Sequence, residues 1–174
     1  MVRQAFKYEK EKVIKFYDVV IEANNKAEIN LRWQKNIHPS HKLLNDSVDN
    51  GELFIYEENE EILGACIMNK SFNESYLQIE WGIDAEICEL GVIHVLGVHP
   101  ECFRKGIAEK LLNGVKEYAN KNKIKAIRLD VFKINTPAVK LYEKLGFLRM
   151  GETVMFVPNI GNEYFYLYEY KTEV

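Results

Sequence analysis

The run Val92–Val98 constrains the fold more than any other segment of the chain. It is apolar apart from His94, and a strand this apolar is covered on both of its faces. The residues that follow, 104–121, carry an amphipathic helical pattern. Its apolar stripe consists of Ile107, Leu111, Leu112, Val115, Tyr118 and Ala119. The sequence therefore predicts a central strand in a sheet that helices cover.

Hydrophobic periodicity and turn residues predict the remaining elements. Helices are expected at 8–23, about 40–48 and about 137–145, and strands at 53–56, 62–68, 126–132, about 147–157 and 163–170. We expect Thr136 to cap the helix at 137–145 and Gly146 to end it. The segment 69–89 shows neither the helical nor the strand pattern of apolar residues. The order β-α-α-β-β-β-α-β-α-β-β is typical of a mixed sheet covered by helices.

Length and composition exclude several classes of protein. A chain of 174 residues, 47% of them hydrophobic, suits one compact domain, so we expect a single domain over 1–174. The formal net charge of −3 gives no general electrostatic reason to bind nucleic acid or an anionic membrane. No apolar run approaches the roughly 18 residues that span a bilayer, and Met1–Lys12 lacks the apolar stretch of a signal peptide. These features predict a cytoplasmic protein that binds neither nucleic acid nor membrane.

The cysteines and glycines exclude further chemistry. Cys66, Cys88 and Cys102 are odd in number and form no CxxC pair, so we expect neither a disulfide scaffold nor a metal site. None of the ten glycines precedes a lysine, and no two lie two residues apart. The GK[ST] phosphate loop and GxGxxG are therefore absent, as are GxSxG and HExxH. Kinase, dinucleotide oxidoreductase, α/β-hydrolase and zincin interpretations lose their usual support.

The segment Leu96–Ala108 joins the end of the apolar strand to the helix. It carries the adjacent cations Arg104 and Lys105, followed by the small residue Gly106. First-turn N–H groups of a helix have no intrahelical partner and lie at the positive end of its dipole. Such a turn can hold a pyrophosphate. The alternative is an ordinary strand–helix turn in which Gly106 relieves crowding.

A second segment, 135–147, reads Asn-Thr-Pro-Ala-Val-Lys-Leu-Tyr-Glu-Lys-Leu-Gly-Phe. Together the two segments resemble the GNAT superfamily of acetyl-CoA-dependent N-acetyltransferases. The second is similar to the family pattern N-x-x-A-x-x-L-Y-x-K-x-G-F at every fixed position, and the first is similar to [QR]-x-x-G-x-[GA]. One position departs, because Phe103 stands where the family has Gln or Arg. The order of elements also matches, so the resemblance covers nearly the whole chain.

The resemblance implies an α/β (α+β) fold, with a mixed, mostly antiparallel sheet of about seven strands and about four helices. It also implies direct attack of a primary amine, from a small molecule or peptide, on the thioester of acetyl-CoA in a ternary complex. The strand at 93–98 is then expected to splay from the strand at 126–132, with the cofactor's pantetheine arm between them. The residues expected to bind the cofactor are Leu96, Gly97, Val98, Phe103, Arg104, Lys105, Gly106, Ile107, Ala108, Asn135 and Tyr142. For Gly97, close approach of a ligand and a bulge explain the glycine equally well.

Two residues are candidates for proton transfer. Tyr142, with a reference pKa of about 10, is the candidate general acid for the leaving thiolate; a core tyrosine is the alternative. His94, with a reference pKa near 6.5, is the candidate base, directly or through water; a hydrogen-bonded core histidine is the alternative. Some arylalkylamine members of the family have a histidine at this strand position. Glu80 and Glu89 are rivals, since many members use a glutamate or an ordered water.

The remaining candidates have weaker support. Asn135 either contacts the cofactor, orders its loop or caps the next helix, and Lys144 either approaches a phosphate or is solvated. Cys102 shows no sign of a nucleophile. Trp33 and Trp81, with nearby carboxylates, suit a cationic amine acceptor, although scattered aromatics on a mixed-charge surface explain them too.

A non-catalytic acyl-CoA-binding module or regulatory subunit on the same fold is the second functional hypothesis, and Phe103 favours it slightly. The chain is expected to be a monomer or a homodimer, the latter through the edge of its final hairpin.

Overall fold

The computed structural model describes residues 1–28, 31–157 and 160–174. The chain divides into two compact units. The first comprises Met1–Met68 with His94–Val115, and the second comprises Asn69–Ile93 with Lys116–Val174. The expected turn at 158–162 lies partly outside the described residues.

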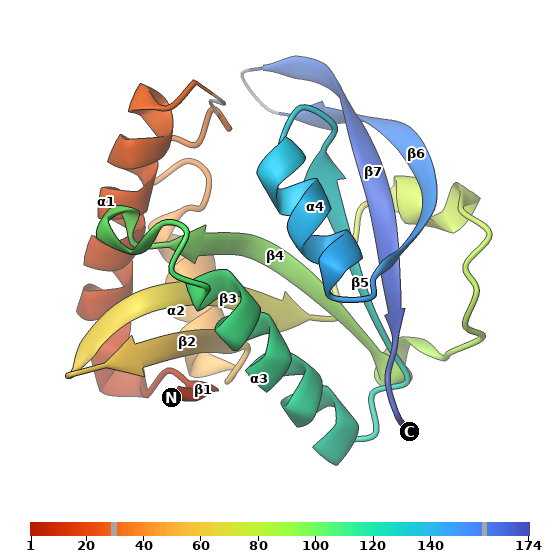
Figure 1. Cartoon of the computed structure of the whole chain (residues 1–174), viewed down its shortest axis with the longest axis horizontal. Helices are drawn as coiled ribbons and strands as arrows, with labels where there is room; N and C mark the ends of the chain where they lie inside the picture. Colours follow the sequence, from red (N-terminus) through yellow and green to blue (C-terminus); the bar gives the residue numbers. More distant parts are fainter. Residues whose placement is uncertain (29–30, 158–159) are drawn as a thin grey trace. The chain divides into compact units, whose positions relative to one another are not determined.

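The expected order of strands and helices is confirmed (Figure 1). The strands are β1 (Val2–Gln4), β2 (Leu53–Glu58), β3 (Glu61–Asn69), β4 (Leu90–Val98), β5 (Ala126–Phe132), β6 (Leu148–Val157) and β7 (Gly161–Lys171). The helices are α1 (Lys10–Lys26), α2 (His41–Asp49), α3 (Ile107–Lys121) and α4 (Thr136–Lys144), with short 3-10 turns η1 (Lys7–Glu9), η2 (Glu74–Gln78), η3 (Ile87–Glu89) and η4 (Pro100–Cys102).

The seven strands follow the order β1-β2-β3-β4-β5-β7-β6. The pairs β1–β2, β2–β3, β5–β7 and β6–β7 are antiparallel, whereas β4 pairs with β5 in parallel over Leu90–Ile93. The prediction of a mixed, mostly antiparallel sheet is therefore confirmed. Strand β4 and helix α3 each contribute residues to both units.

In the first unit, α1 and α2 pack on one face of the sheet. Their apolar side chains form a buried cluster with those of β2, β3 and β4. Helix α3 covers the other face, because a Cβ built on Gly64 of β3 would lie 2.9 Å from Ile107 and 3.6 Å from Leu111. Figure 1 shows α2 behind β2 and β3, and α3 in front of them.

In the second unit, α4 lies on one face of β5 and β7 (Figure 1). The opposite face carries a second buried cluster, which brings the segment after β3 onto the sheet. Its members are Tyr76, Val92, Met155, Phe165 and Leu167. The hydroxyl of Tyr76 donates a hydrogen bond to Asp130 Oδ2 at 2.8 Å, which ties η2 to β5.

A buried ion pair orders the part of 69–89 for which the sequence predicts no element. Arg128 Nε donates to Glu169 Oε2 at 2.8 Å, and both side chains are almost fully buried. The other carboxylate oxygen accepts from the backbone N–H groups of Gly82 and Ile83, at 2.8 and 3.0 Å. A buried carboxylate with these partners is well satisfied, and it fixes the loop to the sheet.

Two expectations about helix ends are wrong. Helix α3 begins at Ile107, not at 104, because Arg104 and Gly106 adopt left-handed conformations that a helix cannot include. Helix α4 is capped by Asn135, not by Thr136, which is its first residue. The Asn135 Oδ1 atom accepts a hydrogen bond from Ala138 N at 3.3 Å, so the amide side chain takes the role expected of the hydroxyl.

Candidate active site

Strand β4 is kinked at Val95, the residue after His94. Val95 has φ of 47°, which is a rare conformation for a β-branched residue. Its carbonyl accepts a hydrogen bond of 2.9 Å from the hydroxyl of Tyr17, a buried residue of α1. Strained backbone of this kind persists only where the surroundings hold it, and it concentrates at functional sites.

Gly97 lies two residues beyond the kink. A Cβ at this position would lie 3.3 Å from Val20 and 3.5 Å from Phe16, both on α1. The glycine therefore lets α1 pack closely on β4, and the left-handed residue of the strand is Val95 instead. Leu96 and Val98 are half-buried, and contact of their backbone with a cofactor stays a prediction.

The loop from β4 to α3 is a succession of tight turns. Cys102 N donates to His99 O at 2.8 Å, and Lys105 N donates to Cys102 O at 3.2 Å. Arg104 and Gly106, on either side of Lys105, are left-handed with φ of 62° and 76°. Backbone that alternates in this way turns successive N–H groups to the same side and forms concave anion-binding sites.

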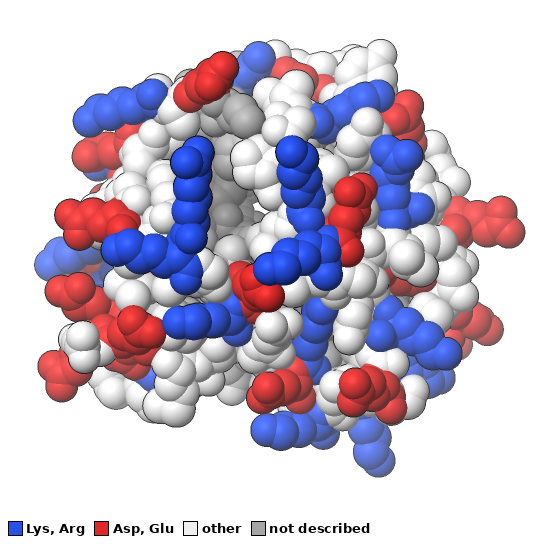
Figure 2. All heavy atoms as spheres, viewed as in Figure 1, with Lys and Arg blue, Asp and Glu red and all other residues white. Residues whose placement is uncertain are grey.

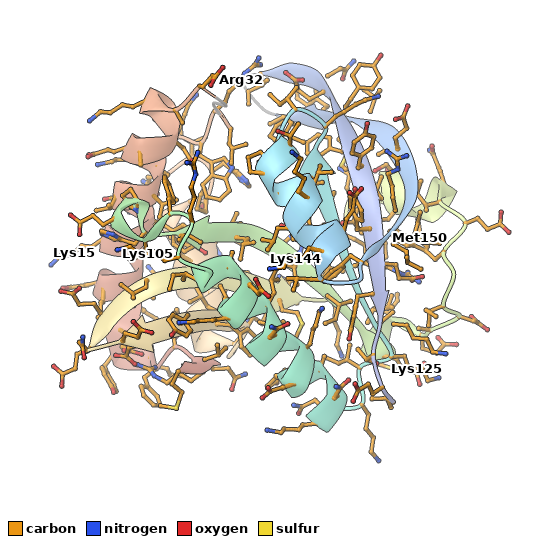
Figure 3. All side chains as sticks on the ribbon, in the orientation of Figure 1. Lys15, Arg32, Lys105, Lys125, Lys144 and Met150 are labelled. Atoms are coloured by element: carbon orange, nitrogen blue, oxygen red, sulfur yellow. The ribbon has the colours of Figure 1, made fainter. Side chains whose placement is uncertain are left out.

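Gly106 faces open space. A Cβ built on it would meet no heavy atom within 4 Å, so the glycine is required by its positive φ and not by crowding. The side chains of Phe103, Arg104 and Lys105 are exposed, and Figure 3 shows Lys105 in the loop before α3. Free space, first-turn amides and two cations together fit the pyrophosphate of coenzyme A.

Tyr142 of α4 is buried, with 5% of its surface exposed. Its ring lies 5.7 Å from that of Phe147 and 6.1 Å from that of Tyr168. Tyr168 donates from its hydroxyl to Glu143 Oε1 at 2.9 Å, and burial together with this bond raises the pKa of Tyr168 to about 12. Sequence reasoning missed Tyr168, although the alternation of tyrosines along β7 places it on the same face of the strand as Tyr166 and Tyr170.

The candidate bases differ in their surroundings. His94 is half-buried in β4, and Glu80 is exposed. Glu89 forms a 2.8 Å ion pair with Lys125 and accepts a hydrogen bond from Glu86 N. The hydrogen bond from Lys125, followed by the one from Glu86, lowers the pKa of Glu89, which weakens it as a proton acceptor.

The two indole rings are engaged within their own units. Trp33 is 8% exposed and belongs to the first buried cluster. Trp81 donates from Nε1 to Tyr76 O at 2.9 Å, and the guanidinium carbon of Arg128 lies 4.2 Å from its ring centroid. A cation therefore already occupies one face of Trp81.

The other candidates take ordinary positions. Lys144 is exposed in the last turn of α4 (Figure 3), where a cation interacts favourably with the helix dipole. Cys102 is half-buried in η4. On the face that Figure 2 shows, basic and acidic side chains are intermixed. Among the described residues, no three His, Cys, Asp or Glu side chains are grouped to hold a metal ion, and no described helix is long and apolar enough to cross a membrane.

The mixed sheet and the open glycine turn that precedes α3 define an α/β acyltransferase. Residues 15–147 match the model of the Acetyltransferase (GNAT) family. The chain belongs to this family, as its two motifs predict.

Relatives and solved structures agree with this assignment. A mycothiol acetyltransferase of Arthrobacter sp. strain FB24 is 36% identical over 72 residues, which is 41% of this chain and 22% of that protein. The chain thus spans about a fifth of the length of this relative. The ribosomal-protein-S18-alanine N-acetyltransferase of Escherichia coli has the same fold, with a TM-score of 0.71, 16% identity and coverage of 100% of this chain and 94% of that one. So has yncA of Salmonella typhimurium, solved with its cofactor acetyl-CoA, with a TM-score of 0.69, 15% identity and coverage of 99% and 94%.

Proposed function

We propose that this chain transfers an acetyl group from acetyl-CoA to a primary amine of a small molecule or peptide, by direct attack in a ternary complex. The observation that carries the proposal is the open space at Gly106, where left-handed backbone precedes the first turn of α3. Membership of the GNAT family supports acetyl-CoA as the ligand. The names of similar proteins refer to different molecules, mycothiol in one and an alanine of ribosomal protein S18 in another, so the proposal extends to primary amines in general.

The loop residues would bind the coenzyme A end of the co-substrate. Main-chain N–H groups of Arg104, Gly106, Ile107 and Ala108 bind the pyrophosphate, and the exposed side chains of Arg104 and Lys105 add positive charge. Phe103 contributes no charge, so binding depends on the amides and these two cations. Backbone groups of Leu96 and Val98 pair with the pantetheine arm. When bound, acetyl-CoA supplies an acetyl group activated as a thioester.

Three protein groups would serve the chemistry. His94 accepts the proton that the amine nitrogen loses as its bond to the acetyl carbon forms. A backbone N–H of β4 after the kink at Val95 donates to the carbonyl oxygen as negative charge develops there. Tyr142 donates its proton to the sulfur as the carbon–sulfur bond breaks.

A non-catalytic acyl-CoA-binding module is the second candidate, and the observation that favours it is Phe103 in place of the family's polar residue. One experiment separates the two candidates. Calorimetry measures acetyl-CoA binding, and release of free thiol is followed with a panel of amines that includes small amines, polyamines, amino acids and peptides. Binding with thiol release supports the enzyme, and binding without release from any amine supports the module. If acetyl-CoA does not bind, both are wrong.

A further inference from the structure

Tyr17 of α1 lies outside both family motifs, and its side chain is held firmly against β4. Only 1% of its surface is exposed. Its ring meets that of Phe16 edge-on, with centroids 5.3 Å apart, and its centroid lies 6.4 Å from that of Trp33. A Cβ built on Gly97 would lie 3.5 Å from Tyr17 Cε1, so the absence of a side chain at Gly97 lets the tyrosine ring lie against the strand. The Tyr17 hydroxyl therefore has one defined position.

This hydroxyl supports the strained residue of β4. It donates a hydrogen bond of 2.9 Å to the carbonyl of Val95, whose φ of 47° is rare for a β-branched residue. The side chain of Val95 favours extended backbone, so the left-handed conformation depends on its surroundings. Burial raises the pKa of Tyr17, and the hydroxyl therefore keeps its proton and stays a donor at neutral and alkaline pH.

The bond to Tyr17 also sets the direction of the next N–H group. The carbonyl of Val95 and the N–H of Leu96 belong to one peptide group, which is planar, and in a trans peptide the two point in opposite directions. In a regular strand both lie in the plane of the sheet. Here the carbonyl accepts from a helix that packs on the face of the sheet, so the N–H of Leu96 points away from α1. The parallel ladder of β4 with β5 covers Leu90–Ile93, and the kink follows two residues later.

We propose that Tyr17 positions the N–H of Leu96 to donate to the thioester carbonyl of bound acetyl-CoA, an inference that rests on the proposed acetyl transfer. Tyr17 is a positioning residue, because it acts through the Val95 carbonyl and does not touch the co-substrate. With the hydroxyl in place, the N–H is fixed before negative charge develops on the carbonyl oxygen, and a preorganised donor of this kind lowers the barrier. Without the hydroxyl, Val95 relaxes toward the extended conformation, and the N–H of Leu96 turns back toward the plane of the sheet.

The kinetic test removes one oxygen atom and keeps the ring. Tyr17→Phe should lower kcat about 30-fold, with KM for the amine and affinity for acetyl-CoA within about 2-fold of the wild type. Tyr76→Phe is the matched control, because it removes the hydroxyl of another buried tyrosine together with its 2.8 Å bond to Asp130. It should keep the wild-type kcat. Chemical denaturation shows that each variant is folded under the assay conditions. Wild-type kcat in Tyr17→Phe, or equal losses in the two variants, overturns the proposal.

A second measurement does not depend on turnover. Infrared difference spectra of acetyl-CoA labelled with ¹³C at the thioester carbonyl report its stretching frequency in the complex without an amine. A hydrogen bond to the carbonyl oxygen lowers this frequency, so the wild type and Tyr76→Phe should show a lower frequency than free acetyl-CoA. In Tyr17→Phe the frequency should return most of the way to that of free acetyl-CoA. The same frequency in Tyr17→Phe and the wild type overturns the proposal.

The wild-type spectrum is decisive even if Tyr17→Phe does not fold. Binding of acetyl-CoA with an unshifted carbonyl frequency means that no N–H of β4 donates to the carbonyl, and it overturns the proposal while thiol release still supports the proposed function. Failure of the proposed function has a different signature. Thiol is then released with no amine, whereas the carbonyl shift and its dependence on Tyr17 persist.

Discussion

Helices α3 and α4 begin in opposite ways, although both carry family motifs. The first turn of α4 is closed by its own chain, because the Asn135 side chain accepts from Ala138 N and Pro137 needs no acceptor. The four residues before α3 are Phe103, Arg104, Lys105 and Gly106, and none has a side-chain oxygen. The α3 amides therefore face space that the chain leaves open at Gly106. The N-terminal end of α3, where we propose that phosphate binds, thus lacks the side-chain cap that α4 has.

The largest loss of acetyl-CoA affinity should come from filling the open space at the N-terminal end of α3. We expect Gly106→Glu to weaken acetyl-CoA binding at least about 100-fold, or about 2.7 kcal/mol. The new side chain projects into the open space, and its carboxylate repels phosphate and competes for the amides. Calorimetry at constant ionic strength measures the change.

Backbone strain alone must be separated from this effect. Gly51 has nearly the same φ, 69° against 76°, so Gly51→Ala and Gly106→Ala should each cost about 1 kcal/mol of folding stability. Only the variants at Gly106 should lose affinity for acetyl-CoA. Equal affinity in Gly106→Glu and the wild type would remove the phosphate site from α3.

We expect α4 to contribute to the rate of acetyl transfer, through Tyr142, and not to acetyl-CoA binding through its N-terminal amides. Tyr142→Phe should lower kcat about 30-fold and leave the affinity for acetyl-CoA within about 2-fold of the wild type. Tyr168→Phe is the matched control. It removes a second buried hydroxyl, with its bond to Glu143, and should cost about 1 kcal/mol of stability without a loss of kcat. Equal losses of kcat in the two variants would mean that packing, not proton donation, explains Tyr142.

Removing the α4 cap should lower the stability of the fold and leave the affinity for acetyl-CoA largely unchanged. Asn135→Ala should lower the free energy of unfolding by about 1 kcal/mol, because Ala138 N loses its acceptor. Asn135→Asp keeps a capping oxygen and should stay close to the wild type. Chemical denaturation measures both. If Asn135→Ala instead lowers acetyl-CoA affinity with stability unchanged, Asn135 is a cofactor ligand and the contrast between the helices fails.

Elements whose structure depends on neighbouring residues could be predicted from the sequence. Strand β5 was predicted with its observed bounds, 126–132, from alternation alone. The second family motif falls on helix α4 as expected, whereas the first lies mostly in the turns before α3. The 69–89 segment was not predictable, because its order comes from Glu169, 86 residues after Ile83. The kink at Val95 was missed for the same reason. A β-branched residue favours a regular strand locally, and its hydrogen-bonding partner Tyr17 lies 78 residues earlier.

The candidate site likewise combines features that local sequence predicts with features that only the fold creates. The motif pointed to Gly106, but its open surroundings are a property of the fold. Asn135 was correctly suspected as a cap among other roles, since Asn is a strong capping residue at that spacing.

The smallest expected effect concerns the positive charge of Lys105, and it tests whether this charge strengthens acetyl-CoA binding beyond what the α3 amides provide. Lys105→Gln should weaken acetyl-CoA binding about 3-fold at low ionic strength, and the difference should vanish near 0.5 M salt, where the Debye length falls to about 4 Å. Lys15→Gln is the control, because Lys15 is an exposed lysine of α1 and its loss changes the net charge equally. The two variants share the general loss of attraction for an anion, so their difference isolates the charge in the loop. If they weaken binding equally, the amides and Gly106 alone distinguish the α3 end from the capped end of α4.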